Sequence, residues 1–178
     1  DPGRIDYERE NIGQYGLNHS SHSTISLNDL PGVLTRRNLF YPDVYREASL
    51  SFKCKQERGC FVLMLEHDGF RRLNERIKCY RRIFKFKEDS ITITDLLTGS
   101  GSYFYESFFQ LPENSSTQIK TSTELNERKL IGEVSPMGGW RATSYGKIEK
   151  SLTRRFYGHI QLPFEVDYQL ICCKELKN

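Results

Sequence analysis

The 178-residue chain carries 26 basic and 23 acidic residues, a formal net charge of +3, and 37% hydrophobic residues, including 11 Phe and 10 Tyr. This length suits one domain with a sizeable core, and so balanced a charge disfavours a dedicated nucleic-acid binder. No apolar run approaches the roughly 20 residues of a membrane-spanning helix, so no membrane segment is predicted.

Short blocks of alternating apolar and polar residues, separated by turn residues, predict strands along most of the chain. In chain order these predicted strands are 25–27, 48–54, 60–66, 81–87, 90–95, 103–110, 160–162 and 165–173. Gly99-Ser100-Gly101 is predicted to be a hairpin turn, and 113–130 an exposed loop or a pair of strands. Helical periodicity is hard to find. The pattern therefore predicts an all-β sandwich or barrel in a single domain over residues 1–178.

The first candidate site involves the two histidines that lie three apart, His19 and His22, just before the strand predicted at 25–27. With Asp1 of the upstream Asp1-Pro2-Gly3 loop, they could bring imidazole and carboxylate to a sheet edge, where a metal or an acidic sugar would be held. An ordinary polar loop is the alternative interpretation. No spacing in the chain matches a zinc finger, a His-Glu-x-x-His helix, a nucleophile elbow or a phosphate-binding glycine loop.

A second group of candidates is basic or aromatic. On the strand predicted at 81–87, alternation places Arg82 on one face and Arg81 with Lys85 on the other. These cations are candidates for contact with an anionic glycan, or they belong to an ordinary solvated face. Trp140, the only tryptophan, could stack on a sugar ring or lie in the core.

The five cysteines are odd in number and contain no Cys-x-x-Cys pair. They are Cys54, Cys60, Cys79, Cys172 and Cys173. Reduced thiols are the expected state, which argues mildly against an oxidising compartment.

Several short motifs follow one another in an informative order. Asp1-Pro2-Gly3 precedes Ser21-His22-Ser23-Thr24-Ile25 and Asn28-Asp29. Later motifs are His67-Asp68-Gly69-Phe70, Tyr80-Arg81-Arg82-Ile83, Ile93-Thr94-Asp95 and Gly139-Trp140-Arg141-Ala142-Thr143-Ser144-Tyr145-Gly146. In this order they resemble the heparinase II/III-like polysaccharide lyases through nearly the whole chain.

That resemblance implies the C-terminal antiparallel β-sandwich, two packed sheets, of a larger protein. An N-terminal α/α toroid and the first sandwich strands would precede residue 1. Members of that family cleave uronic-acid polysaccharides by β-elimination, in which a base removes the proton α to the carboxylate and an acid protonates the leaving oxygen. The resemblance thus implies an acidic polysaccharide partner, proton-transfer groups in the toroid and a periplasmic or secreted location. The fragment alone would be inactive.

The resemblance also implies zinc in the full-length protein, because many members hold this metal in the sandwich. It carries Asp1 and His22 over as two ligands, while a third ligand, a histidine, would lie upstream of residue 1. The site within this chain is therefore expected to be incomplete. His19 has no clear counterpart and is expected to be a loop residue.

Three departures from the pattern put the lyase activity in question. Ser23 stands where Asn is usual, Tyr80 where His is usual, and Tyr103 where His often follows the glycines. One alternative is a non-catalytic carbohydrate-associated β-sandwich linked to surface polysaccharide metabolism. Another is a generic β-sandwich binding module.

Overall fold

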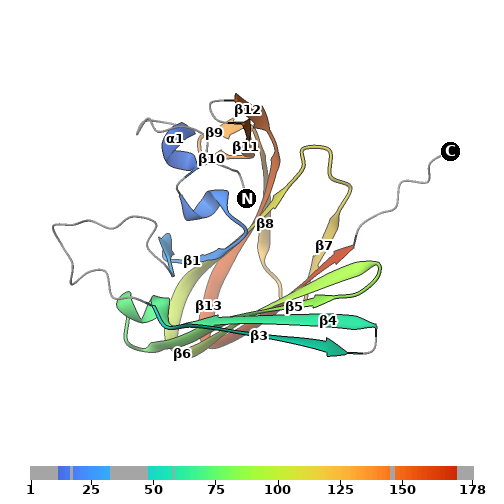
Figure 1. The fold of residues 1–178 in the computed structure, drawn as a ribbon. Helices are drawn as coiled ribbons and strands as arrows, with labels where there is room; N and C mark the ends of the chain where they lie inside the picture. The colour runs from blue at the N-terminus through green and yellow to red at the C-terminus, as the bar shows by residue number, and fades with distance from the viewer. Residues whose placement is uncertain (1–11, 17, 33–47, 58, 145–146, 172–178) are drawn as a thin grey trace. The chain divides into compact units, whose positions relative to one another are not determined.

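The computed structural model describes residues 12–16, 18–32, 48–57, 59–144 and 147–171, and the fold is nearly all β (Figure 1). Helical structure in these residues is limited to α1 (Ile12–Tyr15) and the 3₁₀ turns His19–Ser21 and Gly69–Arg72. The strand pairs are antiparallel, so the predicted all-β, antiparallel class is confirmed. Asp1 and the predicted strand end at Cys172 and Cys173 lie outside the described residues.

The chain forms two compact units, and the first comprises Asp1–Arg37, Phe104–Ser115 and Leu125–His159. Its strands include β1 (Ile25–Leu27), β2 (Leu30–Pro31) and β8 (Asn126–Ile131). It also contains the C-terminal part of the long strand β6 (Ser90–Leu111) and the N-terminal part of the long strand β13 (Leu152–Ile171). β1 pairs with residues 105–107 of β6, and β8 pairs with residues 152–157 of β13. Two hairpins complete the unit: β9 (Glu133–Val134) with β10 (Met137–Gly138), and β11 (Trp140–Ser144) with β12 (Lys147–Lys150).

The second unit comprises Asn38–Tyr103, Ser116–Glu124 and Ile160–Asn178. Its meander runs through β3 (Leu50–Glu57), β4 (Cys60–His67), β5 (Ile77–Phe86) and the first part of β6, as Figure 1 shows. β7 (Gln118–Thr121) pairs with residues 168–171 of β13. The two strands β6 and β13 thus contribute residues to both units.

Each unit has its own apolar core, because aromatic and branched side chains alternate with polar ones along the strands. Buried residues of the first unit include Ile25, Leu27, Tyr105, Phe108, Phe109 and Phe156. Those of the second include Phe70, Ile77, Tyr80, Leu97, Val166 and Tyr168. Many of the Phe and Tyr residues counted in the sequence therefore lie in the cores.

The prediction of a hairpin turn at Gly99-Ser100-Gly101 is wrong, because β6 runs through this segment without a break. Gly99 and Gly101 have φ values of +131° and +105°, which glycine adopts without strain. A Cβ on Gly99 would meet the Arg76 backbone oxygen at 2.1 Å, close to the register shift between Ile77 and Cys79. These glycines therefore mark an irregular, closely packed point within a strand.

Other strand boundaries also differ from the prediction. The strands predicted at 160–162 and 165–173 are parts of the single strand β13, which passes through Pro163. The segment 113–130 holds strands, as one of its two interpretations proposed, but β7 and β8 pair with β13 and not with each other. The β9–β10 and β11–β12 hairpins were not predicted; β9 and β10 have only two residues each, too few to show alternation.

The membrane and cysteine predictions can also be compared with the structure. No helix among the described residues is long and apolar enough to cross a membrane. Cys54, Cys60 and Cys79 are free thiols, as the sequence predicted. Burial raises the pKa of Cys79 to about 11, so this thiol is protonated at neutral pH.

Candidate functional site

The candidate site lies in the first unit and begins with the turn that carries His19. Asn18 caps the 3₁₀ turn through its side-chain oxygen, which accepts a hydrogen bond from Ser20 N at 3.5 Å. Ser21 Oγ donates to Asn18 O at 2.7 Å and ties the turn from the other side. Burial lowers the pKa of His19, so its imidazole is favoured in the neutral form.

The β1–β2 turn supplies the second group of the site. Asn28 and Asp29 have positive φ values of 51° and 60°, a conformation that Asn and Asp adopt more readily than other residues with side chains. Asn28 also bonds both ways with the Phe104 backbone: its N donates to Phe104 O at 2.8 Å, and its Oδ1 accepts from Phe104 N at 2.9 Å. This anchoring places Asp29 next to strand β6.

Glu106 on β6 is the third group, and it is only 2% exposed. The register pairs it with Ser26, whose Oγ donates to Glu106 Oε2 at 2.7 Å. Arg155 on β13 donates through Nε and Nη2 to Glu106 Oε1, at 2.6 and 2.5 Å. A buried carboxylate needs such partners, because an unpaired one would lose its hydration without compensation.

Competing influences act on the proton affinity of Glu106. Burial is the largest, and it raises the pKa of the Glu106 carboxyl; the hydrogen bond with the Asp29 carboxyl acts in the same direction. Ser26 and Arg155 oppose it by stabilising the charged form. The net effect is a raised pKa of the Glu106 carboxyl, because burial outweighs the stabilisation by Ser26 and Arg155.

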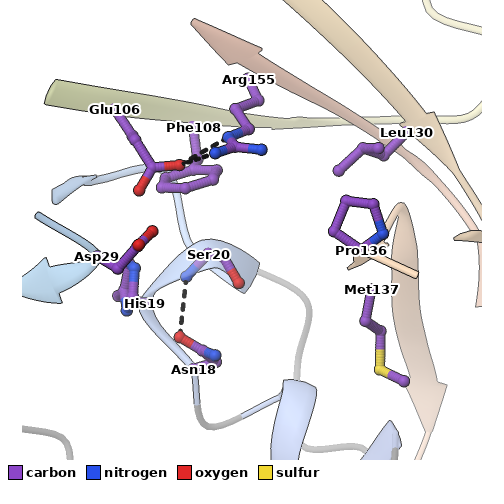
Figure 2. A pocket seen from close by; sticks show the side chains of 10 residues that line it. All are labelled: Asn18, His19, Ser20, Asp29, Glu106, Phe108, Leu130, Pro136, Met137 and Arg155. Carbon is purple, nitrogen blue, oxygen red and sulfur yellow. Dashed lines mark hydrogen bonds and ion pairs between the residues drawn. The ribbon is translucent and has the colours of Figure 1, made fainter. Parts of the chain in front are cut away.

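These groups surround a pocket of about 240 Å³ (Figure 2). Its polar lining consists of Asn18, His19, Ser20, Asp29, Glu106 and Arg155. Its apolar lining consists of Phe108, Leu130, Pro136 and Met137. His19 also packs edge-on against Phe108, with the ring centroids 5.8 Å apart. Figure 2 shows His19, Asp29 and Glu106 on one side and Pro136 with Met137 on the other. Such a pocket can hydrogen-bond hydroxyl or amine groups and contact a carbon skeleton.

The comparisons with known proteins identify the chain's relatives. A family described as heparinase II/III-like, C-terminal, matches residues 1–165. The chain belongs to the heparinase II/III-like family. No curated protein sequence matches it.

Two solved structures show how far the fold is shared. One is the heparan sulfate lyase HepC from Pedobacter heparinus, with a TM-score of 0.66 and 13% identity over 98% of this chain. Another is a heparinase III gene product, with a TM-score of 0.67 and 18% identity over 96% of this chain. The chain spans only 28% and 27% of their lengths. At these identities the likeness shows the fold alone.

In this heparinase II/III-like chain, the two neighbouring histidines His19 and His22 differ in whether they line the pocket. His19, expected to be a loop residue, lines the pocket, whereas His22 is not among the lining residues. The backbone N of His22 donates to His19 O at 3.0 Å, and burial lowers the pKa of the His22 imidazole. The described residues contain no group of three or more His, Cys, Asp or Glu that could hold a metal.

The predicted basic residues lie on β5 in the second unit. Arg81 and Lys85 share one face; Lys85 is exposed, and Arg81 pairs with Glu66 Oε2 at 2.7 Å through Nε. Arg82 points to the opposite face, is 5% exposed and holds Asp95 with two bonds of 2.7 and 2.8 Å. Of the three cations that the sequence analysis proposed as glycan contacts, Arg82 is therefore buried, on the face opposite Arg81 and Lys85.

The remaining family positions have internal partners. Trp140 is half-buried and donates its indole N–H to Glu133 O at 2.9 Å. Tyr80 is buried, and its hydroxyl donates to Asp95 Oδ1 at 2.7 Å. Ser23 Oγ accepts from Gln110 N at 3.1 Å. The Tyr80 departure therefore changes the interior of the second unit and not an exposed group.

Sequence reasoning missed Asp29, Glu106 and Arg155 as members of one site. Glu106 carried a usable signal, because a lone carboxylate within the aromatic run 103–109 must be paired when that strand is buried. Its partner Arg155 lies 49 positions away in the sequence, so no local pattern connects the two.

Proposed function

We propose that this chain is the β-rich C-terminal part of a lyase that cleaves uronic-acid-containing polysaccharides by β-elimination. Family membership over residues 1–165 is the observation that carries the proposal. Two proteins that share the fold are described as a heparan sulfate lyase and a heparinase III, which supports an acidic polysaccharide as the substrate class.

Elimination needs a base for the proton next to the uronate carboxylate, an acid for the leaving oxygen and a cation or donor that stabilises the developing charge. We place the base and acid in the part of the protein that corresponds to the rest of the relatives' length. Lys85 and Arg81 would contact anionic groups of the glycan from one face of β5. Arg82 would support glycan binding indirectly, by fixing β5, the strand that carries Lys85 and Arg81, because its guanidinium bonds to Asp95. Trp140, which is half-buried, would stack on a sugar ring.

Zinc is a second part of the proposal and concerns His22 together with Asp1. The described residues do not by themselves fit a zinc site, because they contain no three-ligand group. The metal would therefore need ligands outside them. Replacing His22 with Ala in the full-length gene product should lower both zinc content and thermal stability, while His159→Ala, at an exposed histidine, should change neither. Unchanged zinc stoichiometry in His22→Ala would refute this assignment.

The lyase proposal is tested with the full-length gene product and a panel of heparan sulfate, chondroitin, hyaluronan and alginate. Elimination creates an unsaturated uronate, whose ultraviolet absorbance rises as the reaction proceeds. A rise with any substrate supports the proposal and names the glycan. A flat trace from protein that is folded by circular dichroism contradicts it and favours the non-catalytic, carbohydrate-associated alternative.

A matched pair of variants tests the basic face. Arg81→Gln combined with Lys85→Gln should weaken glycan binding and reduce its salt dependence, because surface ion contacts are screened by salt. Lys53→Gln combined with Lys55→Gln, which removes as much charge from exposed positions of β3, is the control. If both pairs of substitutions weaken glycan binding equally, the overall charge of the protein explains the effect and the face of β5 does not.

A further inference from the structure

The charges around the pocket of the first unit differ from those expected of a site for an acidic sugar. Arg155 is the only Lys or Arg among the lining residues, and Glu106 Oε1 accepts two of its hydrogen bonds. That contact offsets the charge of the one cation that an incoming carboxylate or sulfate could use. Asp29 adds a second carboxyl group at the exposed side of the pocket.

The formal charge of the lining follows from this inventory. With Arg155 charged and both carboxyls ionised the net charge is −1, and with one of the two carboxyls protonated it is zero. In neither state does the lining carry a net positive charge that would offset an anionic ligand. An anion would face Asp29 in a partly desolvated site, where like charges repel more strongly than in water.

The remaining wall offers contacts that a sugar ring can use. Met137 and Pro136 lie opposite the carboxyl groups, and Phe108 lies beside His19 (Figure 2). Carboxyl and imidazole groups bond to hydroxyl and amine groups, while apolar side chains contact C–H surfaces. The volume of about 240 Å³ is below the range of roughly 300–1,000 Å³ typical of drug-sized ligands, so one ring is the fitting size.

We propose that this pocket binds a single hexosamine ring, with its amine or hydroxyl groups on Asp29 and Glu106, and discriminates against the uronate ring. This inference rests on the proposed function, because an acidic glycan of the heparan class alternates hexosamine with uronate units. The lyase proposal and the hexosamine proposal can fail separately, because lyase activity concerns the whole protein and hexosamine binding concerns only this pocket.

The two methionines of the chain make a direct test possible, since Met137 lines the pocket and Met64 lies on β4 in the second unit. The full-length gene product is labelled with ¹³C in the methionine methyl groups, and the signals of Met137 and Met64 are identified among its methionine signals by their loss in Met137→Leu and Met64→Leu. Methyl glucosaminide, methyl N-acetylglucosaminide and methyl glucuronide are then titrated in turn. The expected dissociation constant is in the millimolar range, as is usual for so small a ligand.

The expected result is a saturable shift of the Met137 methyl signal with both hexosamines, strongest for the free amine, and no shift with the glucuronide. The Met64 signal should stay in place throughout. Binding of the glucuronide as tight as that of the hexosamines, or no shift of Met137 with any sugar, would overturn the proposal. Either outcome is independent of whether the protein cleaves glycans.

A charge-neutral variant sharpens the test. Asp29→Asn keeps the positive φ of 60°, which Asn tolerates, so the turn should persist. It should weaken binding of the free amine several-fold and reduce the discrimination against glucuronide. Glu88→Gln removes the same charge from an exposed turn in the second unit and should leave both affinities unchanged. Equal amine affinity in wild type and Asp29→Asn would remove Asp29 from the site.

Discussion

Replacing Asp95 with Asn should destabilise this protein more than almost any other single isosteric change. Asp95 is fully buried, and its two oxygens accept bonds of 2.7 and 2.8 Å from Arg82, which is 5% exposed. Tyr80 donates a further bond of 2.7 Å to Oδ1. The amide of Asn can neither neutralise the guanidinium nor accept all of these bonds, so buried Arg82 would lose the charge compensation that the Asp95 carboxylate supplies.

The magnitude follows from that burial. Breaking one side of a buried ion pair costs about 3–5 kcal/mol, against a total stability of about 5–15 kcal/mol for a domain. For a chain of this length the loss corresponds to a fall in Tm of about 6–20 °C. The neighbouring pair Arg81–Glu66 provides the control, because its side chains are 38% and 33% exposed. Glu66→Gln should therefore cost at most about 1 kcal/mol.

Urea unfolding followed by far-ultraviolet circular dichroism measures both variants. Fluorescence of Trp140, the only tryptophan, reports the first unit in the same samples and tests whether unfolding is two-state. A cost below about 1 kcal/mol for Asp95→Asn would refute the reasoning. The combined variant Arg82→Met, Asp95→Leu, Tyr80→Phe should recover much of the loss, because no buried charge remains. If it does not, packing and not the unpaired charge explains the effect.

Three further predictions concern individual side chains. Tyr80→Phe removes one buried hydrogen bond to a carboxylate and should cost about 1.5–3 kcal/mol, less than Asp95→Asn, in the same urea experiment; an equal cost would contradict the ranking. Burial lowers the pKa of His67, and its Nδ1 accepts a hydrogen bond from Gly69 N at 3.1 Å. Neutral His67 therefore contributes its full stability above the pKa of the unfolded chain, near 6.5, and that contribution is lost as the pH falls through the lower pKa of the folded state. The stability advantage of wild type over His67→Asn should then shrink between about pH 8 and pH 5, and parallel pH curves would refute this. Gly139→Ala places a Cβ at 2.3 Å from Leu130 O and 2.7 Å from Gly132 N, whereas a Cβ on Gly59 meets nothing within 4 Å; the two glycines have similar φ values of +72° and +68°. Thermal melts should show a cost of about 1 kcal/mol for Gly59→Ala and clearly more for Gly139→Ala. Equal melting temperatures of the two variants would mean that the backbone around residue 139 relaxes to accept the Cβ.

The buried pair shows how sequence and structure share the information. Arg82 and Asp95 were part of the motifs that indicated the family, and period-two alternation placed Arg82 on the face opposite Arg81 and Lys85. Alternation alone could not say which face was buried, because both carry charged residues. The register of β5 and β6, which pairs Arg82 with Asp95, decided it.

The pocket shows the complementary case. His19 was paired with His22 in the first candidate site, Asp29 stood in the Asn28-Asp29 motif, and Glu106 fell within the strand predicted at 103–110, so no pattern joined the three. Their meeting depends on the antiparallel pairing of β1 with β6, which sets Ser26 opposite Glu106 and brings the β1–β2 turn alongside. Arg155 reaches the same point from β13.

The sequence by itself determined the all-β class, the reduced cysteines at positions 54, 60 and 79, and the family, because alternation, cysteine spacing and motif order are local properties of the chain. Tertiary structure alone decided that Gly99 and Gly101 lie within a strand, that Arg82 is buried, and that two carboxyls and an arginine line one pocket. The reason is physical: close backbone approaches and ion pairs join residues far apart in sequence, and they depend on strand register, which no short window of residues specifies.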